Sequence, residues 1–234
     1  GETTDIVEKE MFTFTDSDEL VSLRPEGTAS LMRAYIENSL SNPPGVKKYY
    51  YIGNMFRRER PQKGRFRQFS QAGVEVLECD SPLLDAEIIN LLYNTAIILG
   101  LKEHVKMEIN SIGCNSCRPN YKTDLVNYFS GHLDDLCDDC KRRINTNPLR
   151  ILDCKVEKCK SIALNAPVIL SYLCDDCNNH FESVKEYLNI MDIPYTINSK
   201  MVRGLDYYIR TAFELVTDKL GAASAVGAGG RYDG

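Results

Sequence analysis

The sequence predicts an α+β protein, because strand-like segments lie at both ends of the chain and a helical, cysteine-rich segment lies between them. Residues 1–111 alternate strand-like and helix-like stretches, residues 112–194 are mainly helical, and residues 195–234 return to strand character. The two outer segments are therefore expected to form one β-rich domain that a helical insertion domain interrupts. A chain of 234 residues is long enough to bury the core of one or two domains.

The first segment is expected to begin with a strand pair and a helix. The runs MFTFT and ELVSL have the composition of short strands, and residues 25–40 carry apolar side chains at near-helical spacing. The NPPG run then ends the helix, because proline and glycine favour turns. Two β-prone runs, KKYYYIGNMF and RFRQFSQAGVEVLE, flank a turn at Pro61 and Gly64. This pattern predicts a long hairpin with a basic connecting loop.

A second helix and further strands complete the expected elements. Asp80 or Ser81 caps a helix that Pro82 opens and Gly100 ends. After the insertion, the runs YTIN, AFELVTD and GAASAVGAGG are typical of strands. The sheet of the outer domain is therefore expected to draw strands from both ends of the chain.

Composition and charge are those of a soluble protein. The chain is 43% hydrophobic and 26% charged, with a formal net charge of -5. No apolar run approaches the ~18 residues of a membrane span. The acidic start, GETTDIVEKEMF, lacks the apolar core of a secretory signal, so we expect a cytoplasmic protein. Because the first residue is not Met and the last run, GGRYDG, is rich in glycine, we also expect a piece cut at both ends.

Eight of the nine cysteines fall into four closely spaced pairs, whereas Cys79 stands alone. In a reducing compartment such pairs indicate metal or redox sites before disulfides. Two pairs can supply the four thiolates of one tetrahedral zinc ion, so eight thiols make two sites, or one site with spare thiols. His180 is an alternative ligand, and reduced surface thiols, a redox pair and an iron–sulfur cluster are alternative interpretations. The candidate metal ligands are Cys114, Cys117, Cys137, Cys140, Cys154, Cys159, Cys174 and Cys177.

The loop of the predicted hairpin is dense in cations although the chain as a whole is acidic. Six of the eleven residues 57–67 are arginine or lysine. Guanidinium groups at this density suit a nucleic acid backbone or the phosphates of a nucleotide, and the alternative is a solvated charged loop. Arg57 and Glu59 are two residues apart, so they are expected to share a face at the end of the outgoing strand. On the returning strand, Phe69, Gln71, Gly73 and Glu75 share one face. That mixture of side chains is typical of a ligand platform and not of a simple half-buried strand.

Four stretches of the chain resemble histidyl-tRNA synthetases, which are class II aminoacyl-tRNA synthetases. The hairpin run FRRERPQKGRFRQFSQAGVE resembles their motif 2, and SLRPEGTASLMRAYI (22–36) resembles their amino-acid pocket segment. MVRGLDYYIRTAFE (201–214) and GAGGRYDG (227–234) resemble their two histidine-specific motifs. The resemblance implies a mainly antiparallel sheet flanked by helices. It also implies that motif 1, motif 3 and the anticodon-binding domain belong outside this chain.

The resemblance implies a ligase that works in two steps. Histidine and ATP, bound with Mg²⁺, give histidyl-adenylate, and the histidyl group then passes to the histidine tRNA. The family is dimeric through motif 1, and its insertion domain, here residues 112–194, embraces the acceptor stem of the tRNA. A fragment without motif 3 is expected to be weakly active or inactive.

The resemblance also assigns roles to residues of the nucleotide site. Arg57 and Arg203 hold the α-phosphate, where the reaction develops negative charge, and are the candidate catalytic residues. Glu59 accepts from the adenine amino group, Phe69 stacks on the adenine ring, and Arg65 reaches the terminal phosphates.

The histidine pocket is expected to need an acid for the ring N–H of the imidazole. Glu75 is that acid, with Tyr208 as its second partner, and Glu26, Gln71 and Thr28 hold the α-amino group. The remaining residues assigned to the pocket are Arg203, Tyr207 and Tyr232. Taken singly, each has an ordinary explanation: Glu26 is a helix cap, the tyrosines are core residues, and Glu75 is the partner of an arginine.

Two other functions are possible for such a sequence. A synthetase-like paralogue, the regulatory subunit of ATP phosphoribosyltransferase, binds histidine without aminoacylation. It is expected to lose the phosphate-binding arginines, whereas Arg57, Arg65 and Arg203 are present here. A nucleic-acid-binding module without catalysis explains the basic loop but leaves Glu26, Glu75 and Tyr208 without a role.

Overall fold

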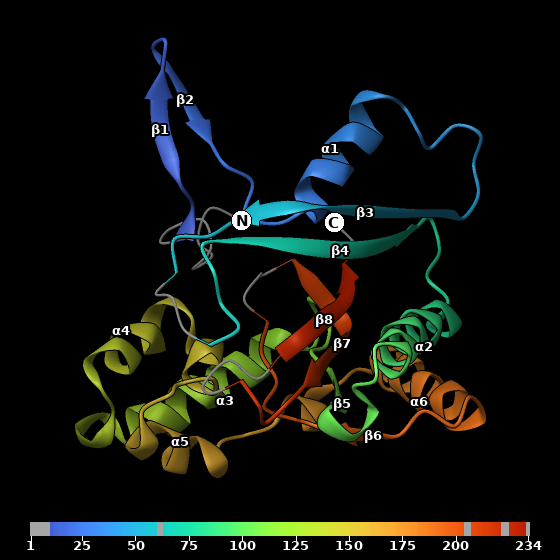
Figure 1. Cartoon of the computed structure of the whole chain (residues 1–234). Helices are drawn as coiled ribbons and strands as arrows, with labels where there is room; N and C mark the ends of the chain where they lie inside the picture. Colours follow the sequence, from blue (N-terminus) through green and yellow to red (C-terminus); the bar gives the residue numbers. More distant parts are fainter. Residues whose placement is uncertain (1–9, 60–62, 204–206, 221–224, 233–234) are drawn as a thin grey trace. The chain divides into compact units, whose positions relative to one another are not determined.

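The computed structural model describes residues 10–59, 63–203, 207–220 and 225–232 (Figure 1). Arg60 of the basic loop and residues 204–206, in the middle of the first histidine-specific motif, lie outside these ranges. The chain divides into two compact units: residues 1–84 with 204–206, and residues 85–203 with 207–234. The three-part division expected from the sequence, with boundaries near residues 111 and 194, stays a prediction.

The first unit is built from two hairpins and a helix. Strands β1 (Thr13–Asp16) and β2 (Glu19–Ser22) pair antiparallel, and helix α1 (Thr28–Glu37) follows them. Strands β3 (Lys47–Phe56) and β4 (Gln68–Leu77) then form a second antiparallel pair. These five elements confirm the order predicted for this part of the chain.

The long hairpin keeps one register from end to end. Lys47 is opposite Leu77 and Phe56 is opposite Gln68, with no bulge between them. Strand β3 ends at Phe56, so Arg57 and Glu59 do not share a strand face, and that expectation was wrong. The Arg57 N–H nevertheless donates to the carbonyl of Arg67 at 2.9 Å. The start of the basic loop is therefore held across the hairpin.

The second unit has a four-stranded sheet in the order β6-β5-β7-β8. The strands are β5 (Lys106–Ser111), β6 (Tyr195–Ile197), β7 (Tyr208–Val216) and β8 (Ala225–Tyr232). Strand β7 pairs antiparallel with β5 and β8, whereas β6 pairs parallel with β5. The sheet therefore draws strands from either side of the insertion, as the sequence predicted.

Two helices cover this sheet. They are α2 (Pro82–Ile98) and α6 (Asp175–Ile190), which share a core with strands β5 and β7 (Figure 1). Ile89 of α2, Val184 of α6 and Ile109 of β5 are 0% exposed in that core. The Leu83 N–H donates to Ser81 Oγ at 3.3 Å, so Ser81 is the cap at the start of α2. Gly100 has a φ of +75°, a conformation that glycine adopts easily, and it closes the same helix as predicted.

The insertion has a core of its own. Its helices are α3 (Arg118–Ser130), α4 (Asp138–Thr146) and α5 (Glu157–Leu164), with single turns η3 (Leu133–Asp135), η4 (Pro148–Ile151) and η5 (Ile169–Tyr172). Another turn, η2 (Lys102–His104), precedes β5. Leu125, Phe129 and Ile151 are 0% exposed at the centre of that core. The described part of the chain contains no helix long and apolar enough to cross a membrane.

Candidate functional site

One face of the β3–β4 hairpin carries the residues predicted to bind ligand. Along β4 the exposure alternates, so Phe69, Gln71 and Gly73 are half-buried and Glu75 is buried. The predicted face is therefore confirmed as the inward one. Gln71 Oε1 is buried and has no hydrogen-bond partner among the described residues. A buried acceptor of this kind favours a ligand that can donate to it.

The start of α1 brings two further predicted residues to this face. Thr28 Oγ1 donates to Glu75 Oε1 at 2.6 Å, which fixes the carboxylate. The carboxylate of Glu26 accepts the N–H groups of Thr28 at 2.6 Å and Ala29 at 2.9 Å. Glu26 therefore does cap the helix, the ordinary role considered above. Its role toward a ligand stays a prediction.

Tyr51 is a residue of this face that sequence reasoning missed. A Cβ added at Gly73 would lie 2.1 Å from Tyr51 Cζ, and one added at Gly27 would lie 2.2 Å from Tyr51 Cε2. The ring therefore occupies the space that side chains at these two positions would take. The signal was present in the sequence, because Tyr51 is opposite Gly73 in the register of a regular hairpin.

The predicted nucleotide-binding residues contact one another. The guanidinium of Arg57 lies over the Phe69 ring at 5.1 Å from its centroid, and Arg57 Nε donates to the carbonyl of Pro25 at 2.8 Å. Glu59 accepts from Arg65 Nη1 at 2.5 Å, and its side chain is 13% exposed. The structure thus brings the two arginines, the acid and the ring together, while their roles stay predictions.

The second unit gathers the other four predicted residues. The Tyr207 ring lies 4.7 Å from that of Tyr208 and 5.5 Å from that of Tyr232, measured between centroids. The guanidinium of Arg203 lies 5.3 Å from the centre of the Tyr208 ring and forms an ion pair with Glu214. Burial raises the pKa of the Glu214 carboxyl, and the nearby Arg203 partly offsets this. Glu214 was not predicted, although it lies within the first histidine-specific motif.

The second unit also contains a buried charge network. Asp85 of α2 accepts from Arg231 of β8 and lies 2.7 Å from Nε2 of His180 on α6. Burial acts to raise the pKa of the Asp85 carboxyl. The hydrogen bonds from His180 and Arg231 lower the pKa by more than burial raises it, so it lies below its usual range. Neither group of residues that could hold a metal ion in the described part of the chain includes His180, so the structure does not support it as a ligand. Asp85 and its partners are too far apart in sequence for any local pattern to pair them.

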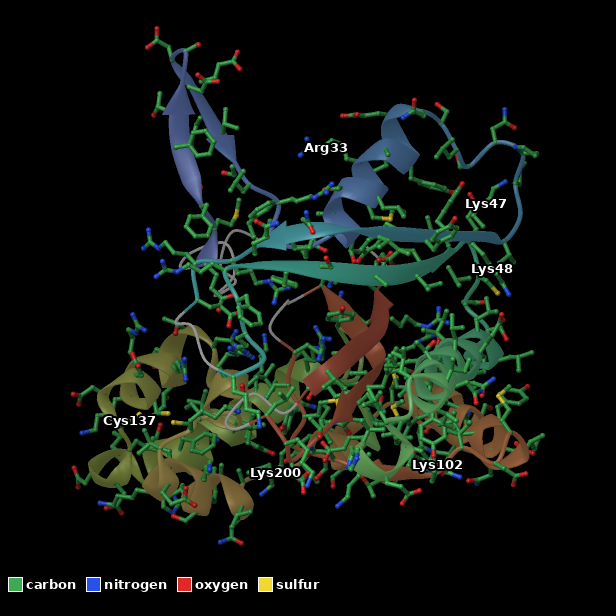
Figure 2. The ribbon with its side chains drawn as sticks, viewed as in Figure 1. Arg33, Lys47, Lys48, Lys102, Cys137 and Lys200 are labelled. Atoms are coloured by element: carbon green, nitrogen blue, oxygen red, sulfur yellow. The ribbon has the colours of Figure 1, made fainter. Side chains whose placement is uncertain are left out.

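The eight paired cysteines form two groups of four. Within each group the sulfur atoms all lie within 4.8 Å of one another. The outer cluster consists of Cys114, Cys117, Cys174 and Cys177, and the inner cluster consists of Cys137, Cys140, Cys154 and Cys159. Figure 2 labels Cys137 where α4 begins. Of the two arrangements left open by the sequence, the structure favours two sites of four.

The thiols of each cluster differ in acidity. Burial acts to raise the pKa of the Cys114 thiol. The backbone N–H groups of Cys117 and Ser116 and the neighbouring thiols have the larger effect and lower the pKa to about 6. Burial raises the pKa of Cys177 in the outer cluster and of Cys140 in the inner cluster. A soft, tetrahedral set of sulfur donors suits zinc.

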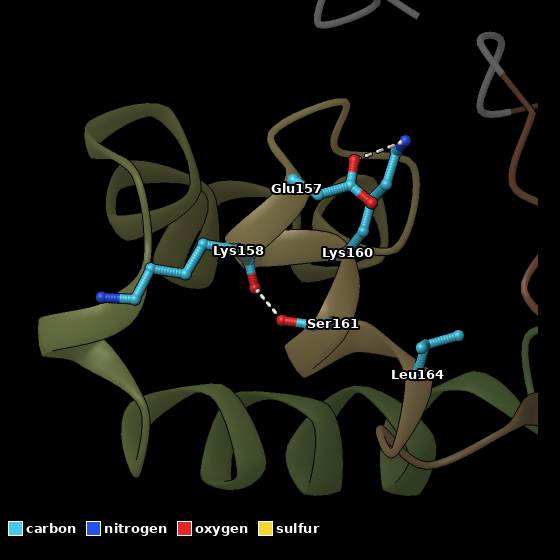
Figure 3. Close-up of a pocket in the computed structure, with 5 residues that line it drawn as sticks. All are labelled: Glu157, Lys158, Lys160, Ser161 and Leu164. Atoms are coloured by element: carbon cyan, nitrogen blue, oxygen red, sulfur yellow. Dashed lines mark hydrogen bonds and ion pairs between the residues drawn. The ribbon is translucent and has the colours of Figure 1, made fainter.

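A surface hollow on α5 is separate from all of these residues. It is lined by Glu157, Lys158, Lys160, Ser161 and Leu164 (Figure 3). These side chains belong to one helix, and Lys160 pairs with Glu157 at 3.2 Å. The hollow contains none of the predicted site residues.

Comparison with known proteins finds that the chain is similar to histidyl-tRNA synthetases. A sequence model described as "Histidyl-tRNA synthetase" matches residues 2–114. The chain is 54% identical to the histidine–tRNA ligase of Desulforamulus reducens and 55% identical to that of Geobacter metallireducens, each over 235 residues and 100% of this chain. It covers 56% and 57% of those proteins, so it spans about half the length of the curated relatives it matches.

Solved structures agree with the sequence matches. The apo histidyl-tRNA synthetase of S. aureus is 39% identical with a TM-score of 0.74, over 96% of this chain and 54% of that one. A Bacillus halodurans protein described as an ATP phosphoribosyltransferase regulatory subunit/histidyl-tRNA synthetase has a TM-score of 0.66 at 21% identity, over 98% of this chain and 63% of that one. The second match shows the fold alone.

Proposed function

The chain belongs to the histidyl-tRNA synthetase family, and we propose that the protein carrying it activates histidine with ATP and transfers the histidyl group to the histidine tRNA. The observation that carries the proposal is the ligand face of the hairpin. It has cations and an aromatic ring at one end and the buried Glu75, held by Thr28, at the other. Phe69 and Glu75 are six residues apart, or about 20 Å along a strand. That length suits an aminoacyl-adenylate.

In the first step, a carboxylate oxygen of histidine attacks the α-phosphorus of ATP, and pyrophosphate leaves. Arg57 and Arg203 stabilise the negative charge that develops on the α-phosphate, and Arg65 holds the terminal phosphates. The adenine ring stacks on Phe69 with its amino group toward Glu59. Because Arg57 now lies over the Phe69 ring, this binding mode requires its guanidinium to leave the ring face for the phosphate.

The histidine pocket selects its substrate through buried polar groups. Glu75 accepts the imidazole N–H. Tyr208, whose neighbours include Tyr207 and Tyr232, contacts the imidazole ring of the substrate. The buried oxygen of Gln71 accepts from the α-ammonium. Glu26 already accepts two backbone N–H groups, but a carboxylate has about four acceptor positions and can accept a further donor. An amino acid without the ring N–H offers the buried Glu75 carboxylate no donor of its own, so it binds more weakly.

In the second step, a ribose hydroxyl at the end of the tRNA attacks the carbonyl carbon of the adenylate, and AMP leaves. We propose that the insertion domain contacts the acceptor stem, that the whole protein is a homodimer, and that it works in the cytoplasm. Mg²⁺ enters with ATP and neutralises its phosphates. The cysteine clusters pack in the core of the insertion, so any zinc there is structural and takes no part in the reaction.

The variants Glu75→Gln and Arg203→Ala test this function in the intact gene product. We expect each to lose histidine-dependent exchange of pyrophosphate into ATP while thermal unfolding stays cooperative. Glu182→Gln is the matched control, because Glu182 is exposed and pairs only with Lys185 in the described contacts. Wild-type exchange in both test variants would overturn the assignment. An intact protein that binds histidine but shows no exchange would instead favour the regulatory-subunit function.

A further inference from the structure

We propose that the two cysteine clusters are two separate zinc sites, each with four thiolate ligands and different structural tasks. The outer site takes Cys114, Cys117, Cys174 and Cys177, and the inner site takes Cys137, Cys140, Cys154 and Cys159. The cysteines of both sites belong to the core of the insertion.

The spacing of the sulfur atoms fits one tetrahedral ion in each cluster. Zinc–sulfur bonds of about 2.3 Å at tetrahedral angles place the sulfurs about 3.8 Å apart. The Cys114 sulfur lies 3.6 Å from that of Cys117 and 3.8 Å from that of Cys174. In the inner cluster, the sulfurs of Cys137 and Cys154 are 3.9 Å apart. Each cluster therefore has the dimensions of a metal-binding site.

Backbone groups also surround the sulfurs as expected for thiolates. The Cys174 N–H donates to Cys117 Sγ at 3.2 Å, and the Cys137 N–H donates to Cys159 Sγ at 3.3 Å. Cys137 and Cys174 stand at the N-caps of α4 and α6, where the partial positive charge of a helix favours an anion. The same arrangement, an N-cap cysteine whose N–H donates to a sulfur of the opposite pair, thus occurs in both clusters.

Other uses of these thiols fit the geometry less well. All eight are free cysteines, and a disulfide bond is about 2.05 Å long, well below the shortest sulfur–sulfur distance given above. In an iron–sulfur cluster the four thiolates are divided between two or four iron atoms, which requires some of them to lie farther apart than in a site for one ion. Four soft donors in a small tetrahedron select zinc or a single iron.

The outer site joins the two ends of the insertion. Its cysteine pairs lie directly before α3 and at the start of α6, about sixty positions apart in the chain. Cys117 is followed by Arg118, which donates to the carbonyl of Ile112 at 3.2 Å and also to that of Tyr208. A metal ion in the outer site therefore fixes the position of Arg118, whose hydrogen bond to the Tyr208 carbonyl supports the start of β7.

The inner site closes a shorter loop. Its first ligand, Cys137, is the N-cap of α4, and its last ligand, Cys159, lies in α5. The Cys137 N–H donates to Cys159 Sγ and Arg143 Nη1 donates to the carbonyl of Arg150 at 3.4 Å, so these contacts stay inside the insertion. Removal of the inner metal should therefore loosen α4 and α5 without changing the strands of the sheet.

Metal analysis of the 234-residue chain tests the proposal. We expect two zinc ions per chain by native mass spectrometry and elemental analysis. Replacement by Co²⁺ should give the visible and thiolate-to-metal bands of tetrahedral sulfur sites, saturating at two equivalents. Less than one metal ion per chain, iron in place of zinc, or saturation at one equivalent would overturn it.

Paired variants test the ligand sets. Cys114→Ser with Cys117→Ser, and Cys137→Ser with Cys140→Ser, should each retain one zinc ion. Cys79→Ser, outside both clusters, should retain two. Loss of both ions from either double variant that stays folded would contradict separate sites. If a double variant fails to fold, the Co²⁺ titration of the unaltered chain still decides the number of sites.

Hydrogen exchange tests the two tasks. The Ile112 N–H donates to the carbonyl of Arg210 at 2.7 Å, and the Arg210 N–H donates to that of Gly113 at 2.9 Å. In the outer-site variant we expect these two amides to exchange at least tenfold faster, whereas in the inner-site variant they should not change. Equal exchange in both variants would refute the division of tasks. This readout does not depend on the proposed synthetase function, so the two proposals can fail separately.

Discussion

The buried network around Asp85 offers the sharpest test of how the second unit is held together. Asp85 Oδ1 lies 2.7 Å from Arg231 Nη2, and Asp85 Oδ2 lies 2.7 Å from His180 Nε2. The three side chains are only 6–9% exposed. The substitution Asp85→Asn keeps the shape of the side chain but removes the negative charge that faces the Arg231 guanidinium. Breaking a buried pair in this way costs about 3–5 kcal/mol.

Urea unfolding followed by circular dichroism measures this loss. With an m value of about 2–3 kcal/mol per molar urea, the midpoint for the unit should fall by on the order of 1–2 M. Asp135→Asn is the control, because its pair with Lys158 at 2.7 Å is more than half exposed and should be worth at most about 1 kcal/mol. A loss for Asp85→Asn no larger than that of the control would refute the reasoning.

The stability difference between the unaltered chain and Asp85→Asn should depend on pH with a defined sign. The pKa of Asp85 is lower in the folded chain than in the unfolded chain, so the carboxylate stabilises the fold above the unfolded value. That contribution is lost as the pH falls through the lower, folded value. The stability difference between the unaltered chain and Asp85→Asn should therefore be full near pH 6 and shrink below about pH 4. A difference that grows at low pH would contradict this account.

Two further predictions concern the ligand face of the hairpin. Thr28→Val removes the hydroxyl that donates to Glu75. Because a hydrogen bond to a charged group is worth about 1.5–3 kcal/mol, the KM for histidine in pyrophosphate exchange should rise at least tenfold. An unchanged KM would argue against Glu75 in the pocket. Gly73→Ala places a Cβ 2.1 Å from the Tyr51 ring, so overpacking should cost about 1–3 kcal/mol and lower the Tm by several degrees. An unchanged Tm would show that the ring can move aside freely.

The sequence predicted the elements of the fold well because their signals are local. Two β-prone runs on either side of a Pro/Gly turn predicted the β3–β4 hairpin, and Asp80 or Ser81 and Gly100 marked the two ends of α2. The strand assigned to Arg57 extended too far, since the last residue of a strand depends on the partner across the hairpin. The inward face of β4 followed from its period of two.

Contacts between distant segments were beyond such reasoning. The cysteine spacing indicated pairs, but which pairs combine depends on how α3, α4 and α6 pack together. The same limit explains why His180 was considered as a metal ligand when it contacts Asp85, 95 positions away. The ion pair between Glu214 and Arg203 is a third case, because it depends on the folded path of the chain and not on a local sequence pattern.

The central claim is that this chain contributes the histidine-activating site of a synthetase. The most direct measurement is exchange of labelled pyrophosphate into ATP by the intact gene product, with each of the standard amino acids supplied in turn. We predict Mg²⁺-dependent exchange with histidine at least a thousandfold above that with any other amino acid, because an amino acid without the ring N–H cannot donate to the buried Glu75 carboxylate. No exchange with histidine, or similar exchange with another amino acid, would contradict the claim.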